Sequence, residues 1–244
     1  MTPSTLTTAA AATSGPSAGS MDFAMIKRLV LKDWYFLRGP ILGYLAAGAL
    51  ALALVSQAGE GTFFAGSILL ITVLITIGIH LAMATVVEER KNQTLAFVMS
   101  LPVSPAEYTT AKIFANLLIF LLPWLALLVG SFAVIAGNAA LPDGLIPFTG
   151  IVLLEIFASS FLILAVALIS ESQSWTIGAI VFGNLFFQGF LYYVSHIPSI
   201  GQTMNGPRIV WSPAAVNLLV GEIVSIALMV GLTFWLQSRK TDFL

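Results

Sequence analysis

Two carboxylates stand inside otherwise apolar stretches of the sequence, and their chemistry is the first that needs an explanation. Glu155 and Glu222 each lie about nine residues, or roughly 13 Å of helix, from the same end of an apolar run long enough to cross a membrane. An unpaired charge at that depth would cost several kcal/mol, so each side chain must face the bundle or a partner, or carry a proton. The pair either contributes to a polar site or only fixes helix packing by hydrogen bonding.

Three of the other polar residues inside apolar runs are further candidates for a polar site. Asn184 and Gln188, one helical turn apart, could be partners of the two glutamates or part of a polar lining. His80 is a residue type that in such a position more often packs than binds a ligand. With two histidines and no cysteine, the sequence excludes disulfides, thiolate metal sites and a cysteine nucleophile, and we expect no metal site.

The motifs of common enzymes are missing. The sequence contains no His-Glu-x-x-His metal motif, no Gly-x-Ser-x-Gly nucleophile elbow and no Gly-x-x-x-x-Gly-Lys-Ser/Thr phosphate loop. Glu88 and Glu89 invite comparison with paired-glutamate intramembrane proteases, but that pattern needs an arginine where this chain has Gln93. We therefore predict no catalytic residues.

The residues from Glu88 to Lys112 form the one long charged interruption between apolar runs. Ser104-Pro105-Ala106-Glu107 is a capping box with proline at the first helical position, which predicts that a helix begins at Ser104. Just before it, the spacing of apolar residues over 94–101 predicts a short amphipathic helix that ends at Pro102. The segment is either an ordinary loop between spans or a docking element for a soluble partner.

Composition sets the class of protein. Of the 244 residues, 58% are hydrophobic and 9% are charged, which leaves too little polar surface for a water-soluble fold. We therefore predict an all-α integral membrane protein with six transmembrane helices. These are expected over residues 40–58, 63–87, 111–136, 145–169, 175–195 and 213–237. The net charge of −1, without a basic stripe, argues against a nucleic-acid partner.

The N-terminal part of the chain divides into a tail and an amphipathic segment. Residues 1–20 are uncharged and rich in Ala, Ser and Thr, so we expect a disordered tail followed by a single transmembrane domain over 21–244. From Phe23 to Leu37, apolar residues recur at helical spacing opposite a basic arc, which predicts an interfacial amphipathic helix that ends at Gly39-Pro40. Asp33 falls within the apolar arc and is expected to pair with a neighbouring basic residue.

The distribution of basic residues predicts the orientation. Nine of the ten lysines and arginines lie on one side of the six-span scheme, and only Arg208 lies on the other. The positive-inside rule then places both termini and the Glu88–Lys112 segment in the cytoplasm. On the outer side, the apolar connection from Ser195 to Pro213 is expected to form short helices that dip into the membrane interface.

The charged segment carries a family resemblance. Its pattern Glu-Glu-Arg-Lys-x-x-Thr-Leu-x-x-x-x-Ser-Leu-Pro-Val-Ser-x-x-Glu-x-x-x-x-Lys, placed between the second and third of six spans, resembles the ABC-2 family of transporter permeases. The resemblance implies a cytoplasmic coupling helix that docks an ATPase subunit. The expected ATPase-coupling residues are Glu88, Glu89, Arg90, Thr94, Leu95, Phe97, Val98, Leu101, Pro102 and Ser104.

The resemblance also implies an assembly. Two six-span permeases, identical or related, would join two cytoplasmic ATPase subunits in the cell membrane and usually move substrate outward. This chain would bind no cofactor itself, because ATP and Mg²⁺ would belong to the partner ATPase. The residues alone leave an alternative open: an ion-coupled secondary transporter or channel subunit that uses Glu155 and Glu222.

Overall fold

The computed structural model describes residues 23–57, 59–91 and 105–239, and in these ranges the regular structure is entirely helical. Six helices are long and apolar enough to cross a membrane. The elements in chain order are α1 (Phe23–Ser56), α2 (Glu60–Ala82), the π-helix η1 (Met83–Val87), α3 (Glu88–Lys91), α5 (Pro105–Gly137), α6 (Leu145–Ser170), α7 (Gln173–His196), α8 (Pro198–Gly201) and α9 (Pro213–Ser238).

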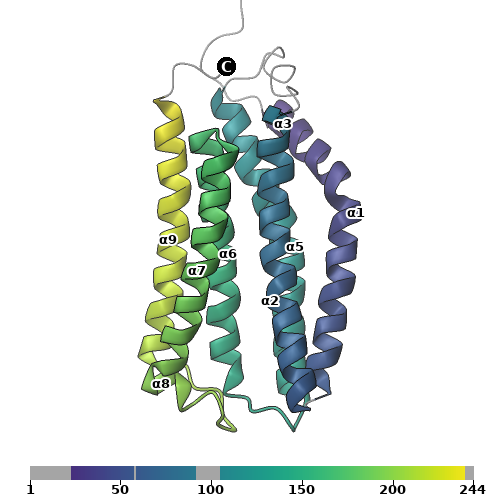
Figure 1. The fold of residues 1–244 in the computed structure, drawn as a ribbon, viewed down its shortest axis with the longest axis vertical. Helices are drawn as coiled ribbons and strands as arrows, with labels where there is room; N and C mark the ends of the chain where they lie inside the picture. Colours follow the sequence, from purple (N-terminus) through teal and green to yellow (C-terminus); the bar gives the residue numbers. More distant parts are fainter. Residues whose placement is uncertain (1–22, 58, 92–104, 240–244) are drawn as a thin grey trace, which may run out of the picture.

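The long helices run side by side as a bundle organised around α6 (Figure 1). Helices α1, α2 and α5 pack against one another, α7 and α9 pack against α6, and α6 also contacts α2 and α5. Most of α6 is buried along its length, because it is apolar on all faces and carries a single charged residue, Glu155. The helix that is apolar all round therefore occupies the centre.

Aromatic side chains fill the core between α5 and α6. Phe120 stacks on Phe157 with ring centroids 5.4 Å apart, and Trp124 and Phe161 pack against the same Phe157 ring. The indole of Trp124 donates a 2.7 Å hydrogen bond to the Leu153 carbonyl, so its polar atom is satisfied within the core. These contacts fix the third and fourth long helices relative to each other.

Helices α2 and α6 approach closely at a glycine. A Cβ atom added to Gly78 would lie 2.2 Å from the Ser160 hydroxyl oxygen. Small residues at such crossings let helix backbones come together, which is the usual source of packing energy between helices in a membrane. Gly78 therefore sets the distance between α2 and the central helix.

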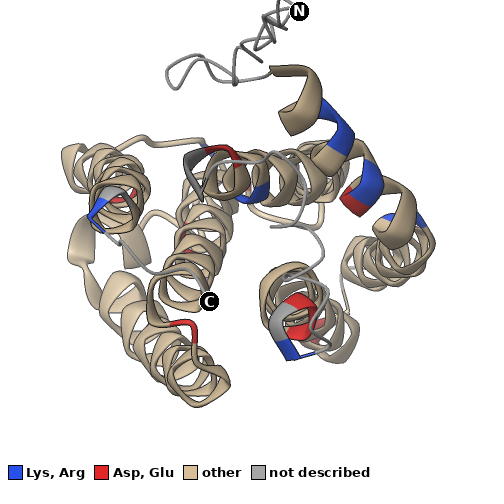
Figure 2. Ribbon diagram, turned by 90° about the horizontal axis from the view of Figure 1, so that it is seen from above, with Lys and Arg blue, Asp and Glu red and all other residues tan. Residues whose placement is uncertain are grey.

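The bundle has two chemically different ends. The start of α1, α3, the start of α5 and the end of α9 lie together at one end, which we call the charged end (Figure 1). Figure 2 looks onto this end and shows basic and acidic residues along the N-terminal part of α1. The opposite end, called the α8 end, holds α8 and the short connections. There the Asn138 side chain donates to the Ser56 carbonyl, and the Gly144 amide donates to the Gly206 carbonyl.

The expectation of a separate amphipathic helix before the first span was wrong. The structure has one 34-residue helix, α1, which continues through Gly39 and Pro40. Proline removes one backbone hydrogen bond, and a helix can absorb that loss by bending rather than by ending. Figure 1 shows the N-terminal part of α1 leaning away from the axis of the rest. No interfacial helix is identified among the described residues.

The other predicted elements are the six spans, the connection between Ser195 and Pro213, and two segments that are not described. Each of the six predicted spans overlaps one of the six long helices. Between Ser195 and Pro213 the structure has one single-turn helix, α8, followed by turns, bends and residues without regular structure. Ile200 of this connection is buried, whereas Trp211 is exposed. The tail 1–20 and the short helix expected over 94–101 lie outside the described residues.

Candidate functional site

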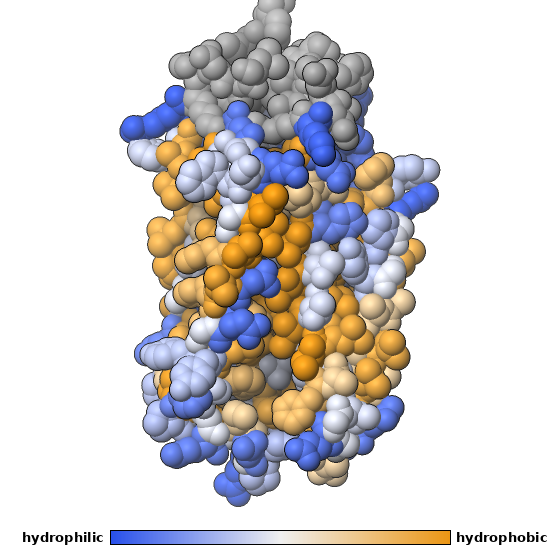
Figure 3. Space-filling model, viewed as in Figure 1, coloured by the Kyte–Doolittle hydropathy of each residue, from blue (hydrophilic) through white to orange (hydrophobic). Residues whose placement is uncertain are grey.

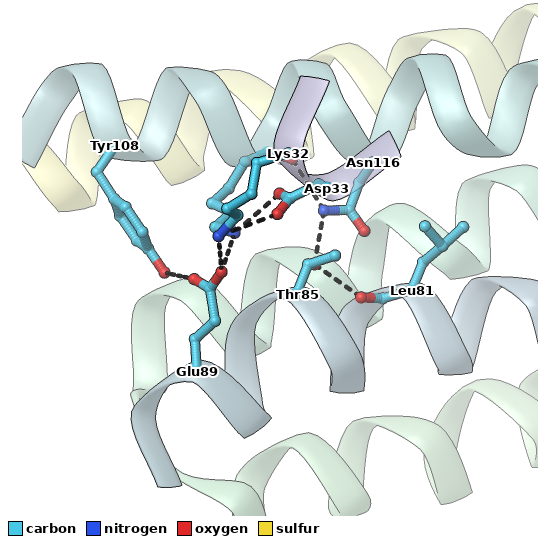
Figure 4. A network of polar contacts seen from close by, with 8 residues as sticks. Lys32, Asp33, Leu81, Thr85, Glu89, Tyr108 and Asn116 are labelled. Atoms are coloured by element: carbon cyan, nitrogen blue, oxygen red, sulfur yellow. Dashed lines mark hydrogen bonds and ion pairs between the residues drawn. The ribbon is translucent and has the colours of Figure 1, made fainter. Parts of the chain in front are cut away.

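A polar network that includes Lys32, Asp33 and Glu89 lies at the charged end (Figure 4). Its centre is a second, buried lysine. Lys112, in the second turn of α5, is 1% exposed. Its ammonium nitrogen lies 2.8 Å from Oδ2 of Asp33 on α1 and 2.8 Å from Oε1 of Glu89 on α3. A buried charge is stable only when it is paired and hydrogen-bonded, and Lys112 meets that condition with two carboxylates from two different helices.

Two further side chains complete the ion network. Lys32 donates to Glu89 and lies 3.3 Å from Asp33, and about half of its side chain is exposed. The Tyr108 hydroxyl donates to the second carboxylate oxygen of Glu89 at 3.2 Å. Among the described side chains of this cluster, two lysines face two carboxylates. It joins α1, α3 and α5 where the three helices meet.

The electrostatics of Glu89 follow from this geometry. Burial by itself would raise the pKa of its carboxyl group, but the Lys112 ammonium and its hydrogen bond, together with Lys32, outweigh burial. The pKa of Glu89 is therefore held below its ordinary value of 4.5. Glu89 is an anion at neutral pH and can keep both lysines in place.

A second set of hydrogen bonds continues the network into the bundle (Figure 4). The Asn116 amide nitrogen donates to the Thr85 hydroxyl and to the Lys112 carbonyl, each at 2.9 Å. Thr85 in turn donates to the Leu81 carbonyl at 2.7 Å. Thr85 belongs to the π-helix η1, a local widening of the helix that is frequent at functional sites. This segment therefore connects α2 to α5 just below the ions.

The network fixes both ends of the charged segment that the sequence singled out. Glu89 lies just before the described residues end at Lys91, and Tyr108 and Lys112 lie just after they resume at Pro105. Glu88 is exposed, and only the backbone of Arg90 is described. The remaining expected coupling residues lie outside the described ranges: Thr94, Leu95, Phe97, Val98, Leu101, Pro102 and Ser104.

The two intramembrane glutamates lie on helices that pack against each other. Glu155 on α6 and Glu222 on α9 are both buried, and α6 packs against α9. Ser159 donates a 3.0 Å hydrogen bond to Glu155. Neither carboxylate oxygen of Glu222 has a hydrogen-bond partner among the described residues. Glu222 thus presents a buried carboxylate that is open to a proton or another cation.

The remaining expected polar residues make separate contacts. Asn184 donates to the carbonyl of Ile180 in its own helix. It also lines a small cavity of about 20 Å³ beside Ser159. His80 lies against Tyr44, with Nδ1 3.0 Å from the tyrosine hydroxyl oxygen. Gln188 lines a different and much larger cavity. In the part of the chain that is described, no group of three or more potential metal ligands occurs.

The large cavity lies in the half of the bundle near the α8 end. It has a volume of about 650 Å³ and is bounded mainly by α2, α6 and α7, with residues of α1 and α5 behind them. Most of its lining is apolar, as at Phe63, Ile71 and Leu191. Figure 3 shows this flank of the molecule, which is mainly hydrophobic between the two polar ends.

The sequence did not reveal the central role of Lys112. Its pairing with Asp33 spans 79 residues and its pairing with Glu89 spans 23 residues, and no local pattern encodes such contacts. One local signal did exist. Asp33 interrupts the buried stripe of α1 formed by Ile26, Leu29, Leu37 and Ile41, so a buried cation opposite it was required.

These features define a class: a polytopic helical membrane protein with six candidate spans and an ordered ion network at one end. A family profile described as ABC-2 family transporter protein matches residues 56–218, from the end of α1 into the first turns of α9. The chain belongs to this family and contains an ABC-2 membrane permease domain, a type of domain that typically lacks ATPase activity of its own. Comparisons with curated proteins and with solved structures found no match.

Proposed function

We propose that this chain is the membrane-spanning subunit of an ABC exporter that works with a separate cytoplasmic ATPase. ATP and Mg²⁺ would bind to the ATPase subunit. Two permease copies, or this chain and a paralogue, would form the pathway. In the cell membrane, the charged end and both termini would face the cytoplasm. Nine of the ten basic residues lie on this side of the predicted six-span topology, as the positive-inside rule requires.

One observation carries this proposal. Lys112 and Tyr108 on α5 both contact Glu89 on α3, so the ends of the segment between Lys91 and Pro105 are held together. The same network includes Asp33 of α1. A force applied to this segment by a docked partner would reach α1, α3 and α5 together through ion pairs that are costly to break. That is the mechanical property that an ATPase-coupling element needs.

The proposal can be tested by reconstitution. The tagged full-length chain is expected to co-purify with an ATPase subunit expressed with it, and the complex should hydrolyse ATP. Proteoliposomes of the complex should move substrate only when ATP is supplied on the ATPase side. Lack of any association with an ABC ATPase would contradict the proposal.

A second candidate function rests on a separate observation. The unpartnered carboxylate of Glu222, buried on a helix that packs against that of Glu155, fits an ion-coupled carrier or channel in which these acids bind a proton or another cation. Replacing each acid by glutamine retains size and hydrogen bonding but removes the ionisable group. Transport that persists without ATP and is lost in Glu222→Gln would favour this alternative. Full transport in both glutamine variants would leave the pair a role in packing only.

A further inference from the structure

The 650 Å³ cavity has a deep wall and an open rim. Buried residues from α5 and α6, among them Ile135, Val152 and Leu153, form the deep wall. The rim residues Phe64 and Ile68 on α2 and Gln188 and Tyr192 on α7 are exposed. Because the rim belongs to the flank that the apolar helices present to their surroundings, the cavity opens sideways toward the membrane.

The size and lining of the cavity suit a small molecule with an apolar body. Ligand pockets commonly measure about 300–1,000 Å³ and are mostly apolar, with a few polar groups that fix the orientation of the ligand. Among the residues that the structure describes, no charged residue and no histidine lines this cavity. A charged ligand group would find no counter-ion there, so the chemistry favours an uncharged ligand.

Three polar residues line the cavity and have no side-chain hydrogen-bond partner among the described residues. Ser67 on α2, Thr149 on α6 and Gln188 on α7 all line it, and none bonds to a described residue. The contrast with their neighbours is informative: the hydroxyls of Thr72 and Ser131 donate to carbonyls of their own helices. In an apolar environment an unpaired hydroxyl or amide costs a few kcal/mol, so these three groups are suited to a ligand or a bound water.

The three groups also lie at similar depth. Thr149, Ser67 and Gln188 are four, seven and eight residues from the helix ends at Leu145, Glu60 and His196. At 1.5 Å per residue they lie roughly 6–12 Å below the α8 end. The three polar residues therefore lie at a similar depth in a mainly apolar cavity.

We propose that this cavity binds an uncharged amphiphile that enters sideways from the membrane. Its hydrocarbon body lies against the apolar walls, and its hydroxyl, amide or ester group bonds to Ser67, Thr149 and Gln188. The binding of such a ligand does not depend on the proposed function. The further inference that this ligand represents the substrate class of an exporter does rest on the proposed function.

The test uses the purified full-length chain in phosphatidylcholine nanodiscs and a diazirine-bearing octadecanol as photoaffinity probe. Mass spectrometry is expected to locate the label on residues of α2 and α7 that line the cavity. Unlabelled octadecanol should compete, and octadecanoate should compete less well because its carboxylate has no counter-ion in the cavity. Labelling spread evenly over all lipid-facing helices, without saturation, would overturn the proposal.

Variants separate the site from the general membrane surface. Ser67→Trp and Thr149→Trp fill the cavity and are expected to reduce saturable labelling more than about tenfold. Gln188→Leu removes one hydrogen bond at an exposed position and should weaken labelling about three- to tenfold. The control Val220→Trp lies on α9 at an exposed position outside the cavity and should change nothing. Equal labelling of Gln188→Leu, Val220→Trp and the parent chain would refute the site.

Two further readouts complete the design. If a second copy of the chain fills the cavity, Tyr192→Cys will cross-link between copies and block labelling, and the proposal fails. Co-purification of an ATPase is measured separately. Specific labelling without ATPase association would support the cavity site and contradict the proposed function. ATPase association without specific labelling would support the proposed function and contradict the cavity site.

Discussion

Lys112 and Asp33 form a buried ion pair between α5 and α1, with 2.8 Å between the ammonium nitrogen and the nearer carboxylate oxygen. Their side chains are 1% and 5% exposed. Charges removed from water so completely hold each other in place, because neither can find an alternative partner in solvent. The pair therefore connects the N-terminal part of α1 to the helix that follows the charged segment.

The first prediction concerns loss of this cation. Lys112→Met removes the buried ammonium that pairs with both Asp33 and Glu89, so the folded state should lose about 3–5 kcal/mol. Thermal unfolding of the purified chain in detergent measures the effect. Lys91→Met, at an exposed position of α3, is the matched control and should change stability by no more than about 0.5 kcal/mol. Similar melting of both variants would show that the network contributes little to stability.

A second prediction uses the titration of Glu89. The pKa of Glu89 is lower in the folded protein than its ordinary value of 4.5, so the carboxylate stabilises the fold above that pH. This stability is lost as the pH falls through the folded-state pKa. The difference in stability between the parent chain and Glu89→Gln should thus be constant near neutral pH and shrink below about pH 4.5.

Denaturation in detergent at a series of pH values provides the measurement for Glu89. Glu88→Gln is the control, because Glu88 is adjacent in sequence but exposed. A difference between the parent chain and Glu89→Gln that stays the same down to pH 3 would argue against the ion pairs with Lys32 and Lys112.

The fold was largely predictable from the sequence, whereas the ion network was not. Six helix-length apolar runs leave few alternatives for a chain in a membrane, since every backbone group must bond within its own helix. Gly39-Pro40 misled the prediction because local propensity cannot tell a bend from an end. The pairing of Lys112 with Asp33 depends on how α1 packs against α5, which the sequence pattern does not encode.

The cavity illustrates the same limit for the candidate binding site. Gln188 was recognisable as a polar residue in an apolar run, but its grouping with Ser67 and Thr149 depends on the arrangement of three helices. Conversely, the similar depth of Glu155 and Glu222 could be read from residue counts, and the helices that carry them pack against each other. Depth along a helix can be counted from the sequence, whereas the contacts between residues of different helices depend on how those helices pack.

A third prediction tests the close approach of α2 and α6. In Gly78→Val the new side chain would collide with Ser160, and overpacking of this kind typically costs about 1–3 kcal/mol. Gly43→Val is the control, because a Cβ atom there meets nothing within 4 Å. Ser160→Gly should restore part of the stability of Gly78→Val, as measured by thermal unfolding. A failure of this rescue would place the cause elsewhere.

The fourth prediction concerns orientation. The chain contains no cysteine, so single cysteines can be introduced at Ser100, between α3 and α5, and at Gln202, next to α8. The basic asymmetry predicts that an impermeant thiol reagent labels position 202 in intact cells. Position 100 should become labelled only after the membrane is permeabilised. The opposite pattern would invert the proposed topology.

The last prediction concerns Phe97 in the charged segment. In the sequence Thr94 to Pro102, the apolar residues Leu95, Phe97, Val98 and Leu101 would be unfavourable in water unless a partner or the membrane covers them. An aromatic residue buried in a partner pocket usually dominates such a contact, with losses of about 2 kcal/mol or more on truncation. Neighbouring charges would set orientation more than affinity. Phe97 is therefore the expected anchor for the ATPase.

Phe97→Ala should leave the chain inserted and folded while it weakens ATPase association at least about thirtyfold, the equivalent of 2 kcal/mol. The remaining complex should hydrolyse ATP with less transport per ATP, because a loosened segment transmits less force to Lys112 and α5. Ser104→Ala serves as a comparison, since loss of a helix cap costs only about 1 kcal/mol. If Phe97→Ala and Leu101→Ala both retain normal ATPase binding and normal coupled transport, the docking role is wrong. The segment would then be a loop that lies on the membrane.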